Sequence, residues 1–409
     1  MAGAPEAKAA RARPRDRSVP AFRPAGKPAP AGGAEGASVL VDARAIFVSG
    51  IGRYLREVLQ AVIADPRFGR VRLLGDPGEL GEFCAGVAEP AKTEIHAYPS
   101  GFYSPRAQAA WLRLRATGRC DSDVAFFPHY DAPLLALPRR SVVTVQDLIH
   151  FKVPSAFPLW RRRAAGVLLR RAVHGAGRVL VTSESTRRDL LERFPGCGSK
   201  VGVIPLGVSP FFAGAADAAS PERIGGPYLL CVGNRKPHKN LVAAVEALAL
   251  LRAEAPELRL AIVGEVYRGW DEVLRRAGEL GVRDRVVEVE GSSDAELRSL
   301  YAGCEALLFP SLYEGFGLPA LEAMAAGAPV VASDRSSLPE VVGDAGLLAD
   351  PEDPAAMADA VRRLRRDPEL RARLVRRGRE RAASYTWERT ARETADVLLR
   401  VAGGAEARP

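Results

Sequence analysis

Two glutamates frame a glycine-rich segment in the second half of this 409-residue chain. Glu314 and Glu322 are separated by the residues Gly-Phe-Gly-Leu-Pro-Ala-Leu. A strand is predicted to end near Phe309 and a helix to begin at about Leu318, because the proline that follows suits a first helical turn. The spacing of the two carboxylates suits hydroxyl groups on either side of a diphosphate. It does not resemble a hydrolase pair that faces one bond.

The backbone of this segment is suited to bind an anion. The first amides of a helix have no partner inside the helix, and the helix dipole adds positive potential there. Such amides can bind a phosphate oxygen, and glycine allows the ligand to approach closely. The amides concerned are those of Phe316, Gly317 and Leu318. The alternative, a helix whose first turn merely favours glutamate, does not explain the Gly-Phe-Gly turn.

A basic loop follows the predicted strand 228–232. Residues 232–241 read Val-Gly-Asn-Arg-Lys-Pro-His-Lys-Asn-Leu, and they hold two of the chain's seven lysines and both of its asparagines. A basic loop at the carboxyl edge of a sheet can balance the charge of a diphosphate. A solvated turn is the alternative interpretation.

Strands and helices alternate along the first half of the chain. Residues 38–42 are a predicted buried strand, 49–54 a glycine-rich turn and 54–63 an amphipathic helix. This succession is the opening unit of a nucleotide-binding α/β domain. Further strands are predicted at 71–74, 124–127, 141–145, 178–181 and 201–208. The alternation predicts a parallel sheet covered by helices on both faces.

A second series of the same kind follows. Its strands are predicted at 228–232, 259–263, 286–289, 306–309 and 329–332, and its helices at 241–251, 270–280 and 318–326. The predicted fold is therefore α/β, with two doubly wound Rossmann-like domains that face each other across a ligand-binding cleft. The predicted parts are a disordered basic tail (1–37), a first domain (38–208), a linker (209–226), a second domain (227–385), and a C-terminal helix and tail (386–409) able to cross back to the first domain.

The composition limits the function classes. Hydrophobic residues make up 47% and charged residues 26%, as in a soluble globular protein. The net charge is +9, but no nucleic-acid-binding motif is present, so nucleic acid is not an expected partner. The tail lacks a signal-peptide core, and no apolar run of about 18 residues predicts a membrane span. Five widely spaced cysteines indicate a reducing compartment, and we expect a cytoplasmic location.

One basic segment allows two interpretations. Residues 157–171 read Phe-Pro-Leu-Trp-Arg-Arg-Arg-Ala-Ala-Gly-Val-Leu-Leu-Arg-Arg. Such a segment can lie peripherally on an anionic membrane surface, here the inner face of the cell membrane, and present the site to a lipid-linked acceptor. It can equally be a helix that packs on the first sheet and exposes its arginines to solvent.

These motifs resemble the donor site of the retaining, GT-B-fold glycosyltransferases of family 4, also called glycosyltransferase group 1. The resemblance rests on the pattern Glu314-x7-Glu322 with its Gly-Phe-Gly-Leu-Pro segment, and it extends from about Val39 to Trp387. Blocks that are individually weaker resemble the family at 49–54, 143–150, 203–207 and 338–343.

The resemblance implies roles for the donor-binding residues. Glu322 would bind the ribose hydroxyls of a nucleotide sugar, and Glu314 would bind its sugar. Gly50 would complete the diphosphate site from the first domain. The amides of Phe316, Gly317 and Leu318 would face the sugar or the diphosphate.

The resemblance also implies which cations neutralise the leaving phosphates. Arg235 and Lys239 would take this role. Family members commonly carry arginine directly before the lysine, whereas this chain has His238 there. We therefore expect Arg235 to supply the guanidinium group.

Gln146 stands where relatives usually carry a histidine, in the run Val-Thr-Val-Gln-Asp-Leu. Glutamine cannot take up a proton near neutral pH. The mechanism favoured for the family needs no such base, because the acceptor attacks from the face that the leaving group departs and the departing phosphate oxygen receives the proton. Gln146 could then still help to position the reactants. The expected catalytic residues are Glu314, Lys239, Arg235 and Gln146.

Other polar residues follow strand ends in the first half. His129, Asp147 and His150 are candidates for the acceptor side, and a structural hydrogen-bonding role is the alternative for the histidines. Asp121 and Asp123 mimic the metal-binding motif of another glycosyltransferase fold, but they precede a strand, so we interpret the match as chance. We expect no metal or other cofactor, since basic side chains and a helix terminus can hold the phosphates.

The sequence thus predicts a retaining, metal-independent hexosyltransferase. It would move a hexose-type sugar from a nucleotide diphosphate sugar to a hydroxyl group of an acceptor, which is a polysaccharide or other saccharide, a lipid-linked molecule or a small metabolite. One alternative is a non-catalytic GT-B protein that binds a sugar nucleotide or scaffolds a partner, and Gln146 favours it. A GT-B epimerase is another alternative.

Overall fold

The computed structural model describes residues 36–99, 101–214, 224–264 and 270–404. The first domain is built on a parallel sheet of seven strands in the order β3-β2-β1-β4-β5-β6-β7. Its central strands are largely buried because helices cover both faces of the sheet. The strands are β1 (Ala37–Asp42), β2 (Phe68–Gly75), β3 (Thr93–Ala97), β4 (Val124–Phe127), β5 (Ser141–Val145), β6 (Arg178–Val181) and β7 (Val201–Val203).

Helices connect these strands in sequence. They are α1 (Ser49–Ala64), α2 (Pro77–Ala85), α3 (Pro105–Ala116), α4 (Ile149–Lys152), α5 (Leu159–Gly175) and α6 (Glu184–Arg193). The reversal of strand order between β1 and β4 is the switch point at which open α/β sheets bind ligands.

The second domain repeats this plan with a parallel sheet of six strands in the order β10-β9-β8-β11-β12-β13. The strands are β8 (Tyr228–Val232), β9 (Arg259–Val263), β10 (Val286–Val289), β11 (Ala306–Phe309), β12 (Val330–Ser333) and β13 (Leu347–Ala349). The helices are α7 (Leu241–Leu250), α8 (Trp270–Glu279), α9 (Asp294–Gly303), α10 (Leu318–Ala326), α11 (Leu338–Val342), α12 (Pro354–Arg366), α13 (Pro368–Ala383) and α14 (Trp387–Ala402). The predicted α/β class with two Rossmann-like domains is confirmed.

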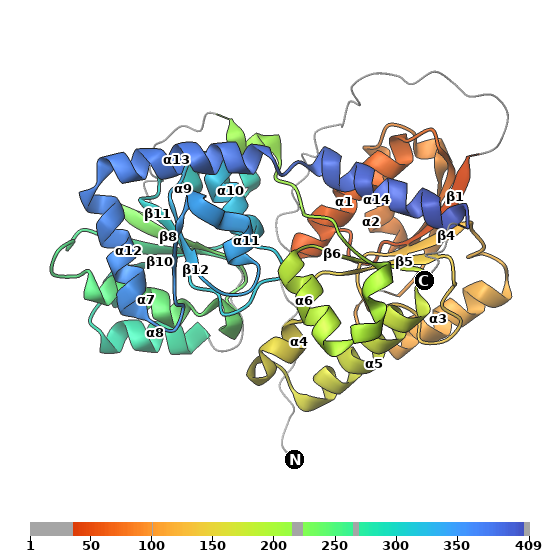
Figure 1. Ribbon diagram of the computed structural model, residues 1–409, viewed down its shortest axis with the longest axis horizontal. Coiled ribbons are helices and arrows are strands. Elements are labelled where there is room, and N and C mark those ends of the chain that lie inside the picture. Colours follow the sequence, from red (N-terminus) through yellow and green to blue (C-terminus); the bar gives the residue numbers. More distant parts are fainter. Residues whose placement is uncertain (1–35, 100, 215–223, 265–269, 405–409) are drawn as a thin grey trace, which may run out of the picture.

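The last helix lies on the first domain. Figure 1 shows α13 along the second domain and α14 continuing onto the first, where it packs against α1. The crossing is held by the Thr390 hydroxyl, which donates to the carbonyl of Pro205 at 2.7 Å. Arg67 and Asp396 add an ion pair at 2.8 Å. The chain therefore passes between the domains twice.

Two predicted elements differ in the structure. Residues 49–54, expected as a turn, form the first turns of α1. Gly52 makes this possible, because a side chain there would lie within 2.8 Å of the carbonyl oxygens of Ala45 and Ile46. The strand predicted at 201–208 ends at Val203, since Pro205 has no amide hydrogen to continue the ladder. The sequence also missed β3, β13 and α9.

Several predictions concern residues outside the described ranges. The predicted tail lies there up to residue 35, as do residues 215–223 of the predicted linker.

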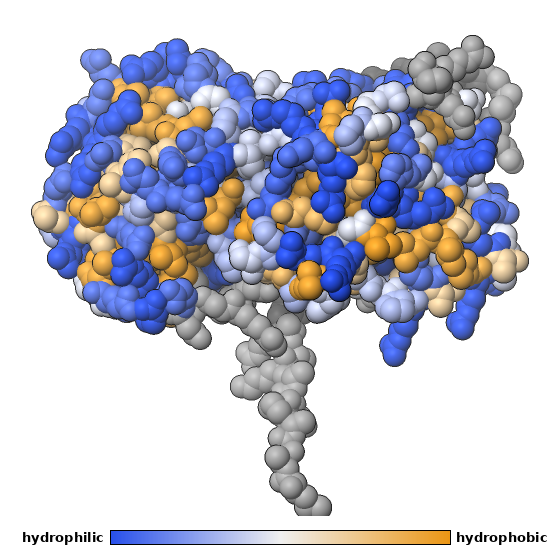
Figure 2. Space-filling model, turned by 60° about the horizontal axis from the view of Figure 1, so that its bottom comes forward, coloured by the Kyte–Doolittle hydropathy of each residue, from blue (hydrophilic) through white to orange (hydrophobic). Residues whose placement is uncertain are grey.

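The five cysteines are all buried and free. Within the described ranges, no helix is long and apolar enough to cross a membrane. On the face shown in Figure 2, hydrophilic and hydrophobic residues are interspersed.

Candidate active site

The segment between β11 and α10 has the predicted geometry. Gly317 precedes the helix with a φ of 117°, a conformation that favours glycine, and a side chain there would lie 2.7 Å from Leu338. Among the described residues, none accepts a hydrogen bond from the amides of Phe316, Gly317 or Leu318. These three donors are therefore available to an anion at the start of a helix.

Lys239 and Glu314 meet at the carboxyl edge of the second sheet. The Lys239 ammonium donates to Glu314 Oε1 at 2.6 Å and lies 5.2 Å from the centre of the Phe309 ring. Burial acts to raise the pKa of Glu314, but Lys239 and His238 outweigh it and hold this pKa below its ordinary value. The Glu314 carboxylate is therefore charged at neutral pH, and the Lys239 side chain has further donors for a phosphate.

The first domain contacts this loop at Gly315. A side chain on Gly315 would lie 2.1 Å from the carbonyl oxygen of Gln146, so only glycine fits. The Gly315 carbonyl accepts hydrogen bonds from Thr182 at 3.1 Å, from Ser183 at 2.8 Å and from Thr186 at 3.1 Å. Two of these hydroxyl groups lie between β6 and α6 and the third in the first turn of α6, which places the start of α6 against the donor loop.

Further hydrogen bonds close the same boundary. The Tyr313 hydroxyl donates to Asp189 at 2.8 Å and accepts from the amide of Leu148 at 3.3 Å. Glu340 of the second domain accepts from two amides at the start of α6, those of Glu184 at 3.0 Å and Ser185 at 3.2 Å. A carboxylate at a helix start is favoured by the helix dipole. The two domains are thus held together in a closed arrangement.

Two predicted residues of the first domain also reach this boundary. Asp147 lies close to Glu314, and burial, followed by the charge of Glu314, raises its pKa, while Lys236 and Lys239 lower it. Gly50, in the first turn of α1, faces Leu318, because a side chain built on Gly50 would meet the Leu318 methyl group at 3.8 Å. The structure therefore brings both domains to the start of α10.

Gln146 has its side chain directed into its own domain. Its amide nitrogen donates to the carbonyl of Pro128 at 3.2 Å, and its backbone carbonyl accepts from the Thr182 hydroxyl at 3.1 Å. The backbone of Gln146 therefore forms part of the domain boundary, while its side chain is hydrogen-bonded in the first domain.

The second predicted carboxylate, Glu322, is 5% exposed, and each of its two oxygens has a partner. Its Oε1 pairs with Arg53 of α1, and its Oε2 accepts from the Tyr301 hydroxyl at 3.0 Å. Arg53 also pairs with Asp294 at 2.8 Å. Burial raises the pKa of Glu322, and Arg53 opposes this rise. Glu322 therefore lies at the domain boundary, where a side chain of the first domain contacts it.

The two candidate histidines lie in an aromatic cluster of the first domain. His129 stacks between Phe102 and Tyr130, with ring centroids at 4.5 and 4.2 Å. The Nδ1 of His150 is hydrogen-bonded to the Tyr130 hydroxyl at 2.9 Å, and its ring lies 4.2 Å from that of Phe157. Burial lowers the pKa of His129 to about 3 and that of His150 to about 4. Both imidazoles are neutral at pH 7 and are weak bases.

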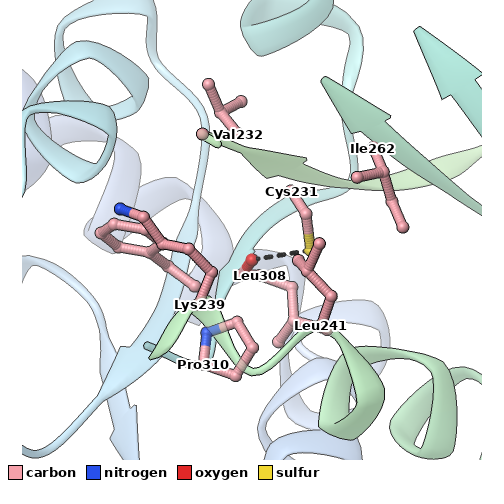
Figure 3. Close-up of a pocket in the computed structure, with 9 residues that line it drawn as sticks. Cys231, Val232, Lys239, Leu241, Ile262, Leu308 and Pro310 are labelled. Atoms are coloured by element: carbon pink, nitrogen blue, oxygen red, sulfur yellow. Dashed lines mark hydrogen bonds between the residues drawn. The ribbon is translucent and has the colours of Figure 1, made fainter. Parts of the chain in front are cut away.

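A small cavity lies beneath Lys239, at the carboxyl ends of the strands (Figure 3). Its volume is about 10 Å³, and its wall includes Gly233, Phe309 and Cys231, whose thiol donates to the Leu308 carbonyl at 3.1 Å. This volume holds about one water molecule. A nucleotide sugar is far larger than this cavity, which lies within the second domain.

Comparison with known proteins shows the family of this chain. The family described as Glycosyltransferase Family 4 matches residues 48–210, and the one described as Glycosyl transferases group 1 matches residues 215–381. The O-antigen chain mannosyltransferase B of Escherichia coli is 33% identical over 276 residues, which are 65% of this chain and 72% of that protein. This chain belongs to the group 1 glycosyltransferases. The predicted family is thereby confirmed.

A further relative supports the family, and solved structures support the fold. The D-inositol 3-phosphate glycosyltransferase of Stackebrandtia nassauensis is 32% identical over 349 residues, or 80% of this chain and 73% of that protein. Sucrose-phosphate synthase from Thermosynechococcus elongatus superposes with a TM-score of 0.73 at 23% identity, covering 90% of this chain and 99% of that one. WaaG, a glycosyltransferase involved in lipopolysaccharide biosynthesis, superposes with a TM-score of 0.69 at 19% identity, covering 88% and 99%. These structures confirm the GT-B architecture.

Arg235 contacts the second sheet of this group 1 glycosyltransferase. Its fully buried guanidinium donates to Glu288 of β10 at 2.9 Å and to the carbonyl of Ile262 at 3.3 Å. Burial lowers the pKa of Arg235, and a buried guanidinium requires a nearby carboxylate. These contacts of the Arg235 guanidinium are with the second sheet, and its expected role beside Lys239 stays a prediction.

Several boundary residues were missed by the sequence reasoning. Arg53 belongs to the Gly-Ile-Gly-Arg-Tyr block and Glu340 to the Leu-Pro-Glu block, so both lie inside segments that already resembled the family. Their partners lie far away in the sequence, which no local pattern reveals.

Asp123 accepts two hydrogen bonds from Ser38, at 2.8 and 2.7 Å, and lies at the amino end of β4. The structure thus gives the Asp121–Asp123 run a structural contact at the opposite edge of the sheet from the site.

Proposed function

We propose that this group 1 glycosyltransferase is a retaining, metal-independent hexosyltransferase that uses a nucleotide diphosphate sugar. The observation that carries the proposal is the Lys239–Glu314 pair at 2.6 Å, next to the three available amides at the start of α10. This arrangement offers a cation and helix amides to a diphosphate and a carboxylate to sugar hydroxyls. Glu322, at the same helix, would accept from the ribose hydroxyls.

The proposed chemistry depends on charge stabilisation. As the bond between the sugar and the phosphate breaks, negative charge develops on the leaving diphosphate, and Lys239 with the helix start would stabilise it. The acceptor hydroxyl would attack from the same face and pass its proton to the departing phosphate oxygen. The low pKa values of His129 and His150 support a route without a protein base.

The names of the relatives support the sugar and acceptor classes. One of the relatives reported above is a mannosyltransferase, and another acts on D-inositol 3-phosphate by its name. The Anabaena protein HepE, which superposes with a TM-score of 0.70 at 18% identity, was solved with UDP and glucose. We propose that the donor substrate of this chain is a hexose carried by a nucleoside diphosphate. We propose that its acceptor is a hydroxyl group on a saccharide, a lipid-linked molecule or a small molecule.

The direct test is transfer itself. The protein should release a nucleoside diphosphate from one member of a panel of nucleotide hexoses, in the presence of a hydroxyl acceptor, and the product should keep the anomeric configuration of the donor by NMR. An inverted product would refute the retaining mechanism. Binding of the donor without release or transfer would support the non-catalytic alternative, and release of an epimerised sugar nucleotide would support the epimerase.

We also propose that the protein works in the cytoplasm, in peripheral contact with the inner face of the cell membrane. On α5, Leu159, Trp160 and Val167 expose 55%, 66% and 58% of their surface, while Leu168 and Leu169 pack on the first domain. The sequence from 148 to 183 has six arginines and one lysine and no acidic residue. Figure 2 looks onto this side of the molecule, where apolar and charged patches adjoin. Exposed apolar groups among arginines suit an anionic lipid surface.

Vesicle binding tests this location. The protein should sediment with vesicles that contain anionic lipid and remain in solution with neutral ones. Trp160→Ser should weaken this binding, whereas Leu250→Ser, an exposed position in the second domain, should not. Equal binding of both variants would refute a role of α5.

A further inference from the structure

Arg53 links the two domains at the predicted ribose carboxylate. It extends from α1 of the first domain and pairs with Glu322 on α10 and with Asp294 at the start of α9. Its guanidinium also lies 5.6 Å from the centre of the Phe212 ring. The Arg53 side chain is 21% exposed, so solvent screens these ion pairs only in part.

Glu322 needs such a partner. A buried carboxylate is costly unless a cation and hydrogen-bond donors satisfy it. Tyr301 satisfies one oxygen and Arg53 the other. Of the described residues, Arg53 is the one cation in an ion pair with Glu322. Since Arg53 belongs to the other domain, this pairing exists only when the domains are closed.

We infer that Arg53 is a positioning residue for donor binding, which holds the Glu322 carboxylate in the place where it accepts from the donor's ribose. The inference rests on the proposed function and adds a residue of the first domain to it. A carboxylate has about four acceptor positions, so Glu322 can keep Arg53 and Tyr301 while it accepts from ribose hydroxyls. Domain closure and the grip on the nucleotide are then coupled through one ion pair.

The charge of Glu322 should depend on Arg53. The charged and titratable groups that face Glu322 are Arg53 from α1 and Asp294 and Tyr301 from α9. Burial and Asp294 raise the pKa of Glu322, while Arg53 and Tyr301 lower it. Without Arg53, this pKa rises, and Glu322 takes up a proton at a higher pH. A protonated Glu322 accepts fewer hydrogen bonds, so nucleotide affinity should then fall more steeply as the pH decreases.

The experiment measures the Kd of UDP and GDP by calorimetry, together with donor KM and kcat. For whichever nucleotide binds the wild type, Arg53→Ala should raise Kd and KM by about ten- to a hundredfold, with a smaller change in kcat. Arg53→Lys should restore part of the affinity. Arg276→Ala, which removes a partly buried ion pair with Glu246 inside the second domain, is the matched control and should bind normally.

A double-mutant cycle decides whether Arg53 acts through Glu322. In a Glu322→Gln background, Arg53→Ala should change Kd by less than about twofold. A full loss in that background, or an unchanged Kd for Arg53→Ala alone, would overturn the inference. The inference would also be overturned if the Kd of the Arg53→Ala variant showed no stronger dependence on pH than the Kd of the wild type.

Two further outcomes have separate meanings. If Arg53→Ala strongly lowers the melting temperature, wild type is compared with Arg53→Lys instead. Equal Kd values for wild type and Arg53→Lys at both pH 6 and pH 8 would then overturn the inference. A wild type that binds neither a nucleoside diphosphate nor a nucleotide sugar would refute the proposed function itself.

Discussion

Replacing Lys239 by alanine tests the central electrostatic claim. The Lys239 ammonium is 2.6 Å from Glu314 Oε1, and both side chains are largely buried. If the leaving diphosphate gains about half a unit of charge some ~4 Å from this ammonium, an effective dielectric constant of about 20 gives a stabilisation of about 2 kcal/mol. The loss of this term should lower kcat about thirtyfold.

The assay must separate turnover from binding. Steady-state transfer at saturating acceptor gives kcat, and calorimetry gives the Kd of the nucleotide sugar. We expect Lys239→Ala to lower kcat more than it raises Kd, because the charge on the leaving group is greatest at the transition state. Lys92→Ala, which removes an ion pair with Glu89 at 2.9 Å in the first domain, is the control and should leave both quantities unchanged.

The result that refutes this reasoning is specific. Equal losses in kcat and donor affinity would show that Lys239 binds the ground state and the transition state alike. An unchanged kcat would remove Lys239 from the catalytic set. A fall in the melting temperature with normal kcat would assign the Lys239–Glu314 pair to stability instead.

Three further predictions concern closure, metal and pH. Tyr313→Phe removes the hydrogen bonds to Asp189 and to the Leu148 amide across the domain boundary. We expect this substitution to raise the donor KM about five- to tenfold. An unchanged KM would show that these hydrogen bonds do not control domain closure. Transfer should survive EDTA, and activity that EDTA abolishes and Mg²⁺ restores would contradict a metal-independent site. Burial lowers the pKa of His150 to about 4 in the folded protein, below its value of about 6.5 in the unfolded chain. Between these two pH values the unfolded chain binds more protons than the folded protein does. The free energy of unfolding should therefore decrease as the pH falls from about 6.5 to about 4, by up to about 1.4 kcal/mol per pH unit. In urea titrations, His150→Gln should show a shallower decrease, and an identical slope would contradict the low pKa.

The elements could be predicted where local sequence and burial agree. The bounds predicted for β4, β5, β8 and β9 are those observed, because strands covered on both faces read as mostly apolar runs. The start of α10 at Leu318 was predicted as well, since a positive φ at Gly317 and the proline after Leu318 are both local requirements. The start of α1 was not predicted, because glycine disfavours helices and only contact with the loop at Ala45 explains Gly52.

Local patterns were enough to predict the α/β class, the two similar domains and the loop with its two glutamates, since periodicity, glycine and proline act through neighbouring residues. The partner of each charged side chain, by contrast, is set by how the folded elements pack. Arg235 lies in a basic loop yet pairs with Glu288, whereas Arg53 reaches Glu322 from 269 positions away. A buried charge takes whichever opposite charge the fold brings within reach, and that choice depends on how sheets and domains pack, which no local pattern encodes.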